Sequence, residues 1–131
     1  MCMKKLEQTQ NDFTNALRAL EEAVLEATSD LEIDGAIQRF EFTYELFWKL
    51  LRAYLQQQGI IVNTPKECFK EAYKLGILQD EETALKIVDD RNLTTHLYDQ
   101  VTSREVFGRI KSVYVKLYTE ALDRIRAREI S

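Results

Sequence analysis

The chain has 131 residues, of which 45% are hydrophobic and 31% charged, and its formal net charge is −4. This length and composition predict a single globular domain over residues 1–131 that buries its own core, and the acidic balance argues against tight non-specific binding of nucleic acid. The chain has no apolar run of the roughly 18 residues that cross a bilayer and no signal-peptide pattern at its start, so we expect a cytoplasmic protein without a membrane segment.

Two long amphipathic helices are predicted in the first half of the chain. The first should stop near residues 28–34, where Ser29, Asp30 and Asp34 offer capping side chains. Its apolar stripe, with spacings of three, four or seven, consists of Leu6, Phe13, Leu17, Leu20 and Val24. The second helix should end at Gly59, which favours a left-handed terminating conformation. Its stripe consists of Ile37, Phe40, Tyr44, Phe47, Trp48, Leu51 and Leu55.

A short third helix is predicted from three start signals in the segment NTPKECF. Thr64 is the expected N-cap, Pro65 occupies the first helical position, and Glu67 completes a capping box. Gly76 should end this helix. No window of the sequence shows the alternation of apolar and polar residues that is typical of a strand.

Two further helices complete the predicted fold. Asp80 opens the fourth, whose Leu85 and Val88 should face inward, and Thr102 with Glu105 forms a capping box that opens the last. The stripe of the last helix consists of Val106, Ile110, Val113, Leu117, Ala121 and Ile125. Four long helices and a short one, joined by short turns, predict an all-α fold: an antiparallel up-and-down four-helix bundle with an additional short helix.

The residue types present argue against most cofactor and metal chemistry. The chain has one histidine, His96, and Leu93 stands three residues before it, so the Glu-x-x-His pairs of a di-iron bundle are absent. Two cysteines offer neither zinc-type spacing nor a disulfide framework. The four glycines are scattered and form no phosphate-binding loop. We therefore expect no metal and no cofactor.

The segment RNLTTHLY, residues 91–98, holds the side chains best suited to chemistry. Cleavage of RNA needs little from a protein, because the 2′-hydroxyl of the substrate is the nucleophile. His96 can take or deliver the proton, since histidine titrates near neutral pH. Arg91 can hold the phosphate through two parallel hydrogen bonds and offset charge that develops on it.

The spacing of this pair leaves two arrangements open. Five positions on a regular helix place Arg91 and His96 roughly 140° apart. Either the helix loosens at Thr94–Thr95, or the two side chains flank a cleft whose other wall is a neighbouring helix or a second subunit.

A plainer interpretation of the same residues is a solvated helix end in which they act as caps or favour the helix dipole. Glu41, Glu45 and Lys49 lie four residues apart on the second helix, and mutual pairing on the surface is their expected role. A functional role for these three residues beside Arg91 is the alternative.

The sequence resembles the HEPN superfamily, in its branch of nucleotidyltransferase substrate-binding proteins. RNLTTHLY matches the Arg-x4-His-x-Tyr motif, QRFEFTYELFWKLLRAYLQQQG is similar to the second helix of that branch, and TPKECFKEAYKLGIL continues the match. The six-residue Arg/His pattern is weak alone, and the helix at the right distance upstream makes it specific.

The resemblance implies a helical bundle that forms a homodimer with the motif near the dimer cleft. It also implies a partner, a minimal nucleotidyltransferase, that acts as antitoxin by transferring AMP to the motif tyrosine of an RNase toxin. Carried over, Arg91 and His96 are the catalytic pair, Tyr98 is the AMPylated residue, and Asn92 is an auxiliary polar group.

Three functions remain open from the sequence. The first is a HEPN-type toxin, a metal-independent endoribonuclease regulated by the nucleotidyltransferase. The second is a non-catalytic substrate-binding or docking subunit of a two-component nucleotidyltransferase, which the acidic net charge favours. The third is a structural helical dimer, which the intact motif disfavours.

Overall fold

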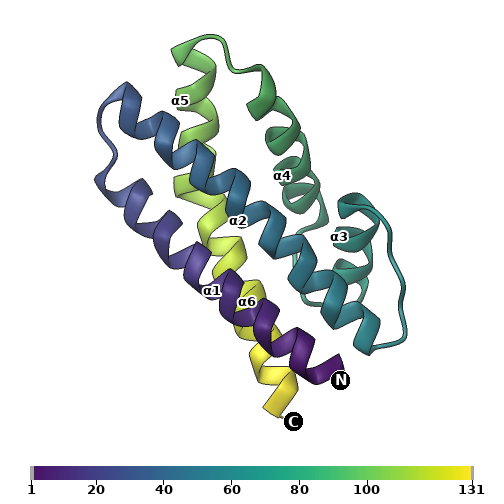
Figure 1. Ribbon diagram of the computed structural model, residues 1–131. Coiled ribbons are helices and arrows are strands. Elements are labelled where there is room, and N and C mark those ends of the chain that lie inside the picture. The colour runs from purple at the N-terminus through teal and green to yellow at the C-terminus, as the bar shows by residue number, and fades with distance from the viewer. Residues whose placement is uncertain (1, 131) are drawn as a thin grey trace.

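The structure is a computed structural model that describes residues 2–130, with side chains described for residues 5–129. All of its elements are helices (Figure 1). In chain order they are α1 (Cys2–Glu26), α2 (Asp30–Gln57), α3 (Pro65–Lys74), α4 (Glu81–Leu93), the 3-10 helix η1 (Thr94–His96), α5 (Gln100–Arg109), the π-helix η2 (Ile110–Tyr114) and α6 (Val115–Ile130). No strand occurs in this described range, and no helix in it is long and apolar enough to span a membrane.

The helices pack as a bundle with α2 at its centre. α1 and α2 form an antiparallel hairpin, and α5, η2 and α6 continue one another as a single long helical segment that passes behind them (Figure 1). α4 runs along the other side of α2, and the short α3 packs against the last turns of α2. The predicted all-α bundle of four long helices and one short helix is confirmed.

Most of the predicted helix starts and ends are confirmed. Ser29, Thr64 and Asp80 are N-caps whose side chains accept from the backbone N–H three residues on. Of the capping box predicted at Thr64 and Glu67, only the bond from the Glu67 N–H to the Thr64 hydroxyl forms. Gly59 and Gly76 adopt positive φ angles of 83° and 81° in the turns that follow α2 and α3, a conformation that costs glycine little.

The capping box predicted at Thr102 is wrong. Asp99 is the N-cap of α5, and its carboxylate accepts from both the N–H and the hydroxyl of Thr102. An aspartate in an extended conformation is the stronger cap, so the helix begins at Gln100, and Thr102 lies inside its first turn.

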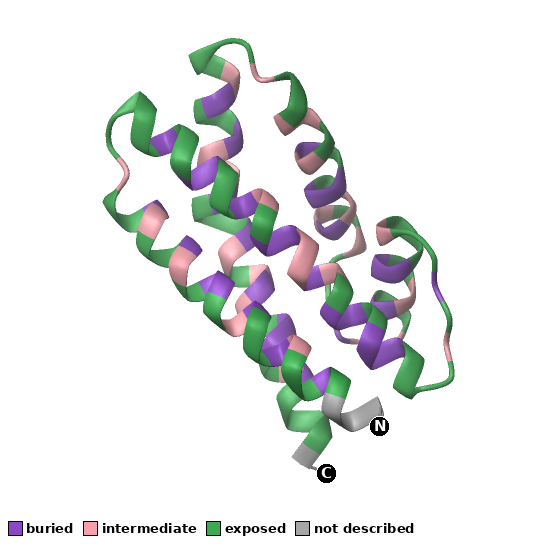
Figure 2. Ribbon diagram, in the orientation of Figure 1, coloured by how far each residue is buried: buried purple, intermediate pink, exposed green. Residues whose placement is uncertain are grey.

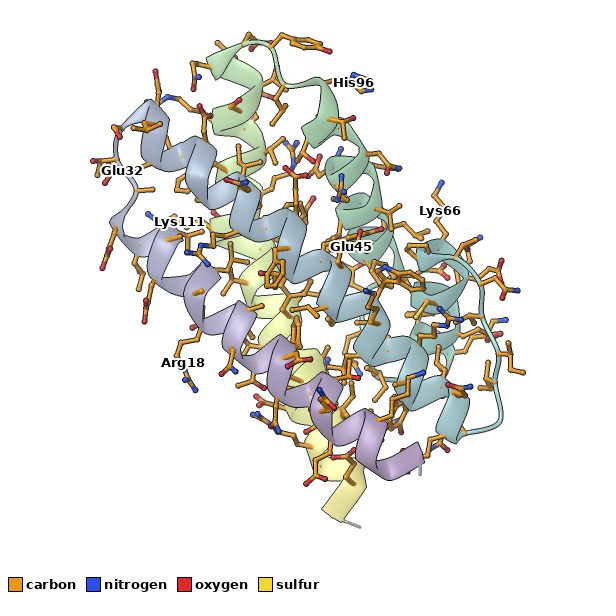
Figure 3. The ribbon with its side chains drawn as sticks, in the orientation of Figure 1. Arg18, Glu32, Glu45, Lys66, His96 and Lys111 are labelled. Carbon is orange, nitrogen blue, oxygen red and sulfur yellow. The ribbon has the colours of Figure 1, made fainter. Side chains whose placement is uncertain are left out.

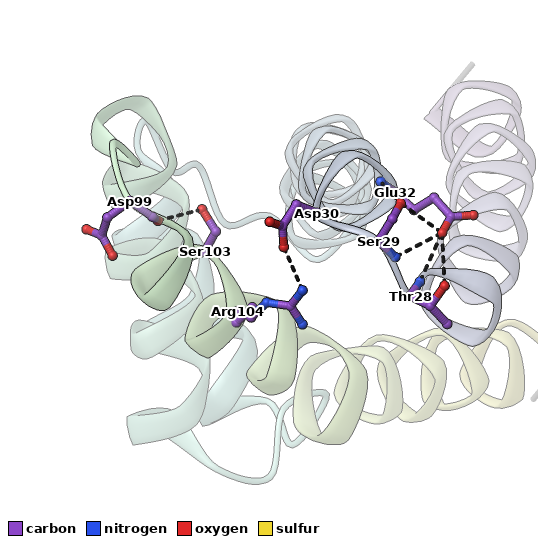
Figure 4. Close-up of polar contacts among 7 residues, drawn as sticks. All are labelled: Thr28, Ser29, Asp30, Glu32, Asp99, Ser103 and Arg104. Atoms are coloured by element: carbon purple, nitrogen blue, oxygen red, sulfur yellow. Dashed lines mark hydrogen bonds and ion pairs between the residues drawn. The ribbon is translucent and has the colours of Figure 1, made fainter.

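A full capping box opens α2. The carboxylate of Glu32, drawn at the start of α2 in Figure 3, accepts hydrogen bonds from the backbone N–H groups of Ser29 at 3.0 Å and Thr28 at 3.2 Å (Figure 4). These bonds, with the one from Ser29 the largest cause, lower the pKa of Glu32 from 4.5 to about 2. The ionised carboxylate is therefore preferred in the folded chain.

Glu32→Gln is expected to remove part of the acid dependence of stability. Because the pKa of Glu32 is lower in the folded chain, its contribution is complete above about pH 4.5 and is lost as the pH falls towards 2. Urea unfolding at pH 7, 4 and 3 measures this: the loss of stability on acidification should be smaller in Glu32→Gln. Glu22→Gln, which removes an exposed carboxylate from α1, is the control. Equal acid dependence in both variants would contradict the prediction.

Buried side chains line the inward faces of all the long helices (Figure 2). At the centre, the Phe47 ring lies 5.3 Å from Phe13 and 4.6 Å from Tyr118, measured between ring centres. On α4, Val88 is buried as predicted, whereas Leu85 is only half-buried, because the inward face of that helix is displaced by one position.

The last helical segment departs from its predicted register in the middle. In the π-helical turn η2, the N–H of Val115 bonds to the carbonyl of Ile110, five residues back instead of four. The wider turn rotates the side chains within it, so that Tyr114 is buried and Val113 is 41% exposed. The prediction that Val113 faces the core is therefore wrong.

Candidate functional site

The segment with the candidate residues begins where α4 gives way to a tighter turn. α4 ends at Leu93 and is followed by η1. The hydroxyls of Thr94 and Thr95 each donate to the carbonyl three residues back, at 2.6 and 2.9 Å. These bonds satisfy terminal carbonyls and let the chain leave the helix. The helix thus loosens at the threonine pair, one of the two arrangements expected from the sequence.

Arg91 lies in the last turn of α4 and points to α2. Its Nη1 is 3.7 Å from a carboxylate oxygen of Glu41, its Nη2 is 4.0 Å from Glu45, and its guanidinium carbon lies 6.0 Å from the centre of the Tyr44 ring. Both ion-pair distances exceed hydrogen-bond length, and the buried Nε has no partner. Charge therefore holds the guanidinium in place, and none of the described residues accepts a hydrogen bond from it.

The ion pairs between α2 and α4 replace the surface pairing that the sequence predicts. Glu41 and Glu45 face Arg91, and Glu45 also accepts from the indole N–H of Trp48 at 3.1 Å. Figure 3 shows Glu45 on the side of α2 that faces α4. The expected pairing with Lys49 is wrong, because the carboxylates meet a cation that is distant in the sequence. The alternative position beside Arg91 is thus observed for Glu41 and Glu45.

His96 and Tyr98 lie on the exposed connection between α4 and α5. Their rings are 6.3 Å apart between centres and inclined at 54°, and Tyr98 is 88% exposed. His96 projects away from the bundle in Figure 3. Among the described residues, neither ring contacts Arg91. Asn92 is exposed, and its backbone carbonyl accepts the hydroxyl of Thr95. A single chain thus places the four candidate residues at one end of α4 without bringing Arg91 and His96 into contact.

A hollow of about 240 Å³ lies between the first half of α2 and the segment from η1 to α5. Its lining includes Asp34, Ile37, Glu41, Thr94, Tyr98 and Asp99. Glu41 connects this hollow to Arg91, with which it forms an ion pair. The candidate arginine and the candidate modified tyrosine are therefore linked through one polar depression.

Two contacts stabilise the start of α5 (Figure 4). Nη2 of Arg104 lies 2.6 Å from a carboxylate oxygen of Asp30, in the first turn of α2. The hydroxyl of Ser103 donates to the backbone carbonyl of Asp99 at 3.1 Å. The ion pair ties the far end of the connection that carries His96 and Tyr98 to α2, and the hydroxyl bond lies within the first turn of α5.

A buried carboxylate stands immediately before Arg91. Asp90 is 2% exposed and accepts from Nε of Arg109 at 2.7 Å, from Nη2 of Arg109 at 2.9 Å, and from the hydroxyl of Tyr114. Burial, and then the bond to Asp90, raises the pKa of Tyr114, and the bond to Asp90 raises the pKa of Arg109. Sequence reasoning missed this cluster, since its three members come from two helices and from a π-turn.

Comparison with known proteins agrees with the fold and with the family resemblance. Residues 8–127 match the family described as nucleotidyltransferase substrate binding protein like. A relative from Haemophilus influenzae, named probable ribonuclease HepT, is 36% identical over 94 residues. The matched part covers 66% of this chain and 63% of the relative, so the chain spans less than two thirds of that protein's length.

Two solved structures are similar over nearly their whole length. A crystal structure of a Thermus thermophilus protein is 42% identical with a TM-score of 0.82, covering 87% of this chain and 98% of its own. A Haemophilus influenzae structure, described as revealing the fold of a substrate binding domain of a nucleotidyltransferase, is 30% identical with a TM-score of 0.80, covering 89% and 98%. The chain belongs to the nucleotidyltransferase substrate-binding protein-like family, which confirms the resemblance seen in its sequence.

Proposed function

We propose that this chain is a HEPN-type toxin component: a metal-independent endoribonuclease that a partner minimal nucleotidyltransferase inactivates by AMPylation. The observation that carries the proposal is the state of Arg91, whose guanidinium is fixed by two carboxylates yet donates no hydrogen bond to any described residue. A phosphate is the ligand that matches a held guanidinium with unsatisfied donors. The name of the Haemophilus relative, probable ribonuclease HepT, supports the same activity.

In this proposal the 2′-hydroxyl of RNA attacks the adjacent phosphorus, and the bond to the 5′-oxygen breaks. His96 accepts the proton from the 2′-hydroxyl, and the imidazolium formed in this way gives a proton to the leaving 5′-oxygen. Arg91 stabilises the charge that develops on the phosphoryl oxygens. Asn92, exposed on the same turn, is an auxiliary polar group.

The chain is expected to be a homodimer in solution. Arg91 and His96 make no contact within one chain, and a two-fold axis supplies the second wall of a site. Exposed apolar side chains at the same end of the bundle support this: Leu31 is 82% exposed, Val101 69% and Tyr98 88%. Light scattering at micromolar concentration should give twice the mass of the chain. A monomer at that concentration would contradict the proposal of a dimer-built site.

Tyr98 is expected to be the residue that receives AMP. Its hydroxyl would attack the α-phosphorus of ATP and release pyrophosphate, and its 88% exposure makes it accessible to a second protein. Intact-mass measurement after incubation with the partner nucleotidyltransferase and ATP should show AMP addition to wild type and none to Tyr98→Phe. Tyr73→Phe, at another exposed tyrosine on α3, is the matched control and should still be modified. Unchanged modification of Tyr98→Phe would place the acceptor elsewhere.

A second function, a non-catalytic docking or substrate-binding subunit of the nucleotidyltransferase, is favoured by a specific observation. Glu41 and Glu45 partly neutralise Arg91 within the chain, and the net charge is −4. The description of the Haemophilus structure, a substrate binding domain of a nucleotidyltransferase, agrees with this role. Retained binding to the transferase by a chain that cuts no RNA would favour it.

A further inference from the structure

The carboxylate of Asp90 occupies an unfavourable place in the fold. It is buried in the last turn of α4, where the helix dipole already concentrates negative charge. A buried charge without partners is strongly unfavourable, so such a residue persists only when donors compensate it. Here three donors do so: two N–H groups of Arg109 and the hydroxyl of Tyr114.

The π-turn explains how Arg109 and Tyr114 reach the same carboxylate. On a regular α-helix, residues five apart lie roughly 140° from each other around the axis, too far to share one partner. In η2 the N–H of a residue bonds to the carbonyl five residues before it, and this wider turn brings residues five apart towards the same face of the helical segment. Arg109 and Tyr114 are five apart, and both contact Asp90.

The last turn of α4 is consequently held on two sides. Asp90 ties it to the segment formed by α5 and η2, and Arg91, the next residue, ties it to Glu41 and Glu45 of α2. The chain then enters η1 and an exposed connection as far as Gln100. The direction in which the Arg91 side chain leaves the helix thus depends on how this turn is anchored.

We infer that Asp90, held by Arg109 and Tyr114, is a positioning residue that fixes the Arg91 guanidinium between α2 and α4, where it would meet the phosphate of RNA. The phosphate contact rests on the proposed ribonuclease function. The positioning of Arg91 is independent of it and can be measured on the free protein.

The test compares two hydroxyl deletions on the same helical segment. Tyr114→Phe removes one donor to Asp90 and keeps the ring, which stacks on Phe40 at 5.8 Å between centres. Tyr118→Phe is the matched control, because the hydroxyl of Tyr118 is buried and has no hydrogen-bond partner. Both variants should fold, as judged by circular dichroism and a cooperative thermal transition.

The first readout is the Nε–Hε signal of Arg91 in a proton–nitrogen NMR spectrum, assigned by its disappearance in Arg91→Lys. It should shift or broaden in Tyr114→Phe and stay in place in Tyr118→Phe. Asp90→Asn, which removes the charge at nearly constant shape, should shift it further. An Arg91 signal that is unmoved in folded Tyr114→Phe and Asp90→Asn overturns the inference.

The second readout is RNA cleavage. Misplacement of a catalytic group by about 1 Å costs up to about 10²-fold, so kcat of Tyr114→Phe should fall by roughly tenfold or more, with KM within about twofold of wild type. Tyr118→Phe should match wild type in both constants. If wild type cuts no RNA while the Arg91 signal shifts in Tyr114→Phe, the positioning role stands and the proposed function fails. If wild type cuts RNA and Tyr114→Phe equals it in kcat and in the Arg91 signal, the positioning role fails and the proposed function stands.

Discussion

His96→Ala is expected to lower the rate of RNA cleavage by about 10²–10⁴-fold, the range typical for loss of a positioned proton-transfer group. The fold should be unaffected, because His96 is exposed on η1 and its ring lies beside that of Tyr98, which is itself exposed. The comparison uses single-stranded RNA with EDTA present, so that contaminating metal-dependent nucleases are inactive. Lys86→Ala, at an exposed position of α4, controls for a surface truncation and should cleave like wild type.

The outcome separates the two proposed functions. A large loss in His96→Ala with an unchanged thermal transition supports the ribonuclease. If wild type and variant are equally inactive and still bind the nucleotidyltransferase, the ribonuclease function is contradicted and the docking-subunit function is favoured. Equal activity of the two would remove His96 from the reaction.

RNA cleavage should be nearly as sensitive to the loss of Arg91 as to the loss of His96. Loss of a charge-stabilising donor costs about 10²–10³-fold, and we expect that range for Arg91→Ala. Arg91→Lys should also be severely impaired, because an ammonium group cannot make the planar two-point contact with a phosphate. Stability should change little: the contacts with Glu41 and Glu45 are partly exposed, and such ion pairs contribute about 0–1 kcal/mol.

A matched variant separates the chemistry of Arg91 from its ion pairs. Glu45→Gln removes one carboxylate and leaves Arg91 in place beside Glu41. It should retain far more cleavage activity than Arg91→Ala, and its thermal transition should lie close to that of wild type. Full activity of Arg91→Lys would show that a single positive charge is enough for cleavage. It would contradict the proposed two-point contact between Arg91 and the phosphate.

Local sequence signals predicted most of the fold because the helices obey local rules. Stripes of apolar residues define the buried faces, and Ser29, Thr64 and Asp80 begin their helices through bonds to residues only three positions away. Where two caps competed, as at Asp99 and Thr102, the choice depended on backbone geometry that residue types alone do not settle.

The candidate site residues could be named from the sequence, but their contacts could not. The motif places Arg91, His96 and Tyr98 at one end of α4, but the partners of Arg91 lie on α2, some fifty residues earlier in the chain. Spacing within one helix cannot reveal a contact between helices. The role of Asp90 could not be predicted for the same reason. Its donors, Arg109 and Tyr114, meet only because the last helical segment departs from the α-helical repeat.

That departure affects how this chain should be aligned with others. A π-turn holds one residue more than an α-helical turn over the same path, so a homologous helix without it lacks one residue between 110 and 114. An alignment that forbids gaps inside helices will then pair every residue on one side of η2 with the wrong neighbour. Tyr114 would be set opposite a position that faces solvent, and the partner of Asp90 would seem to be missing from the relative. Placing a single-residue gap at η2 restores both faces of the helix at once.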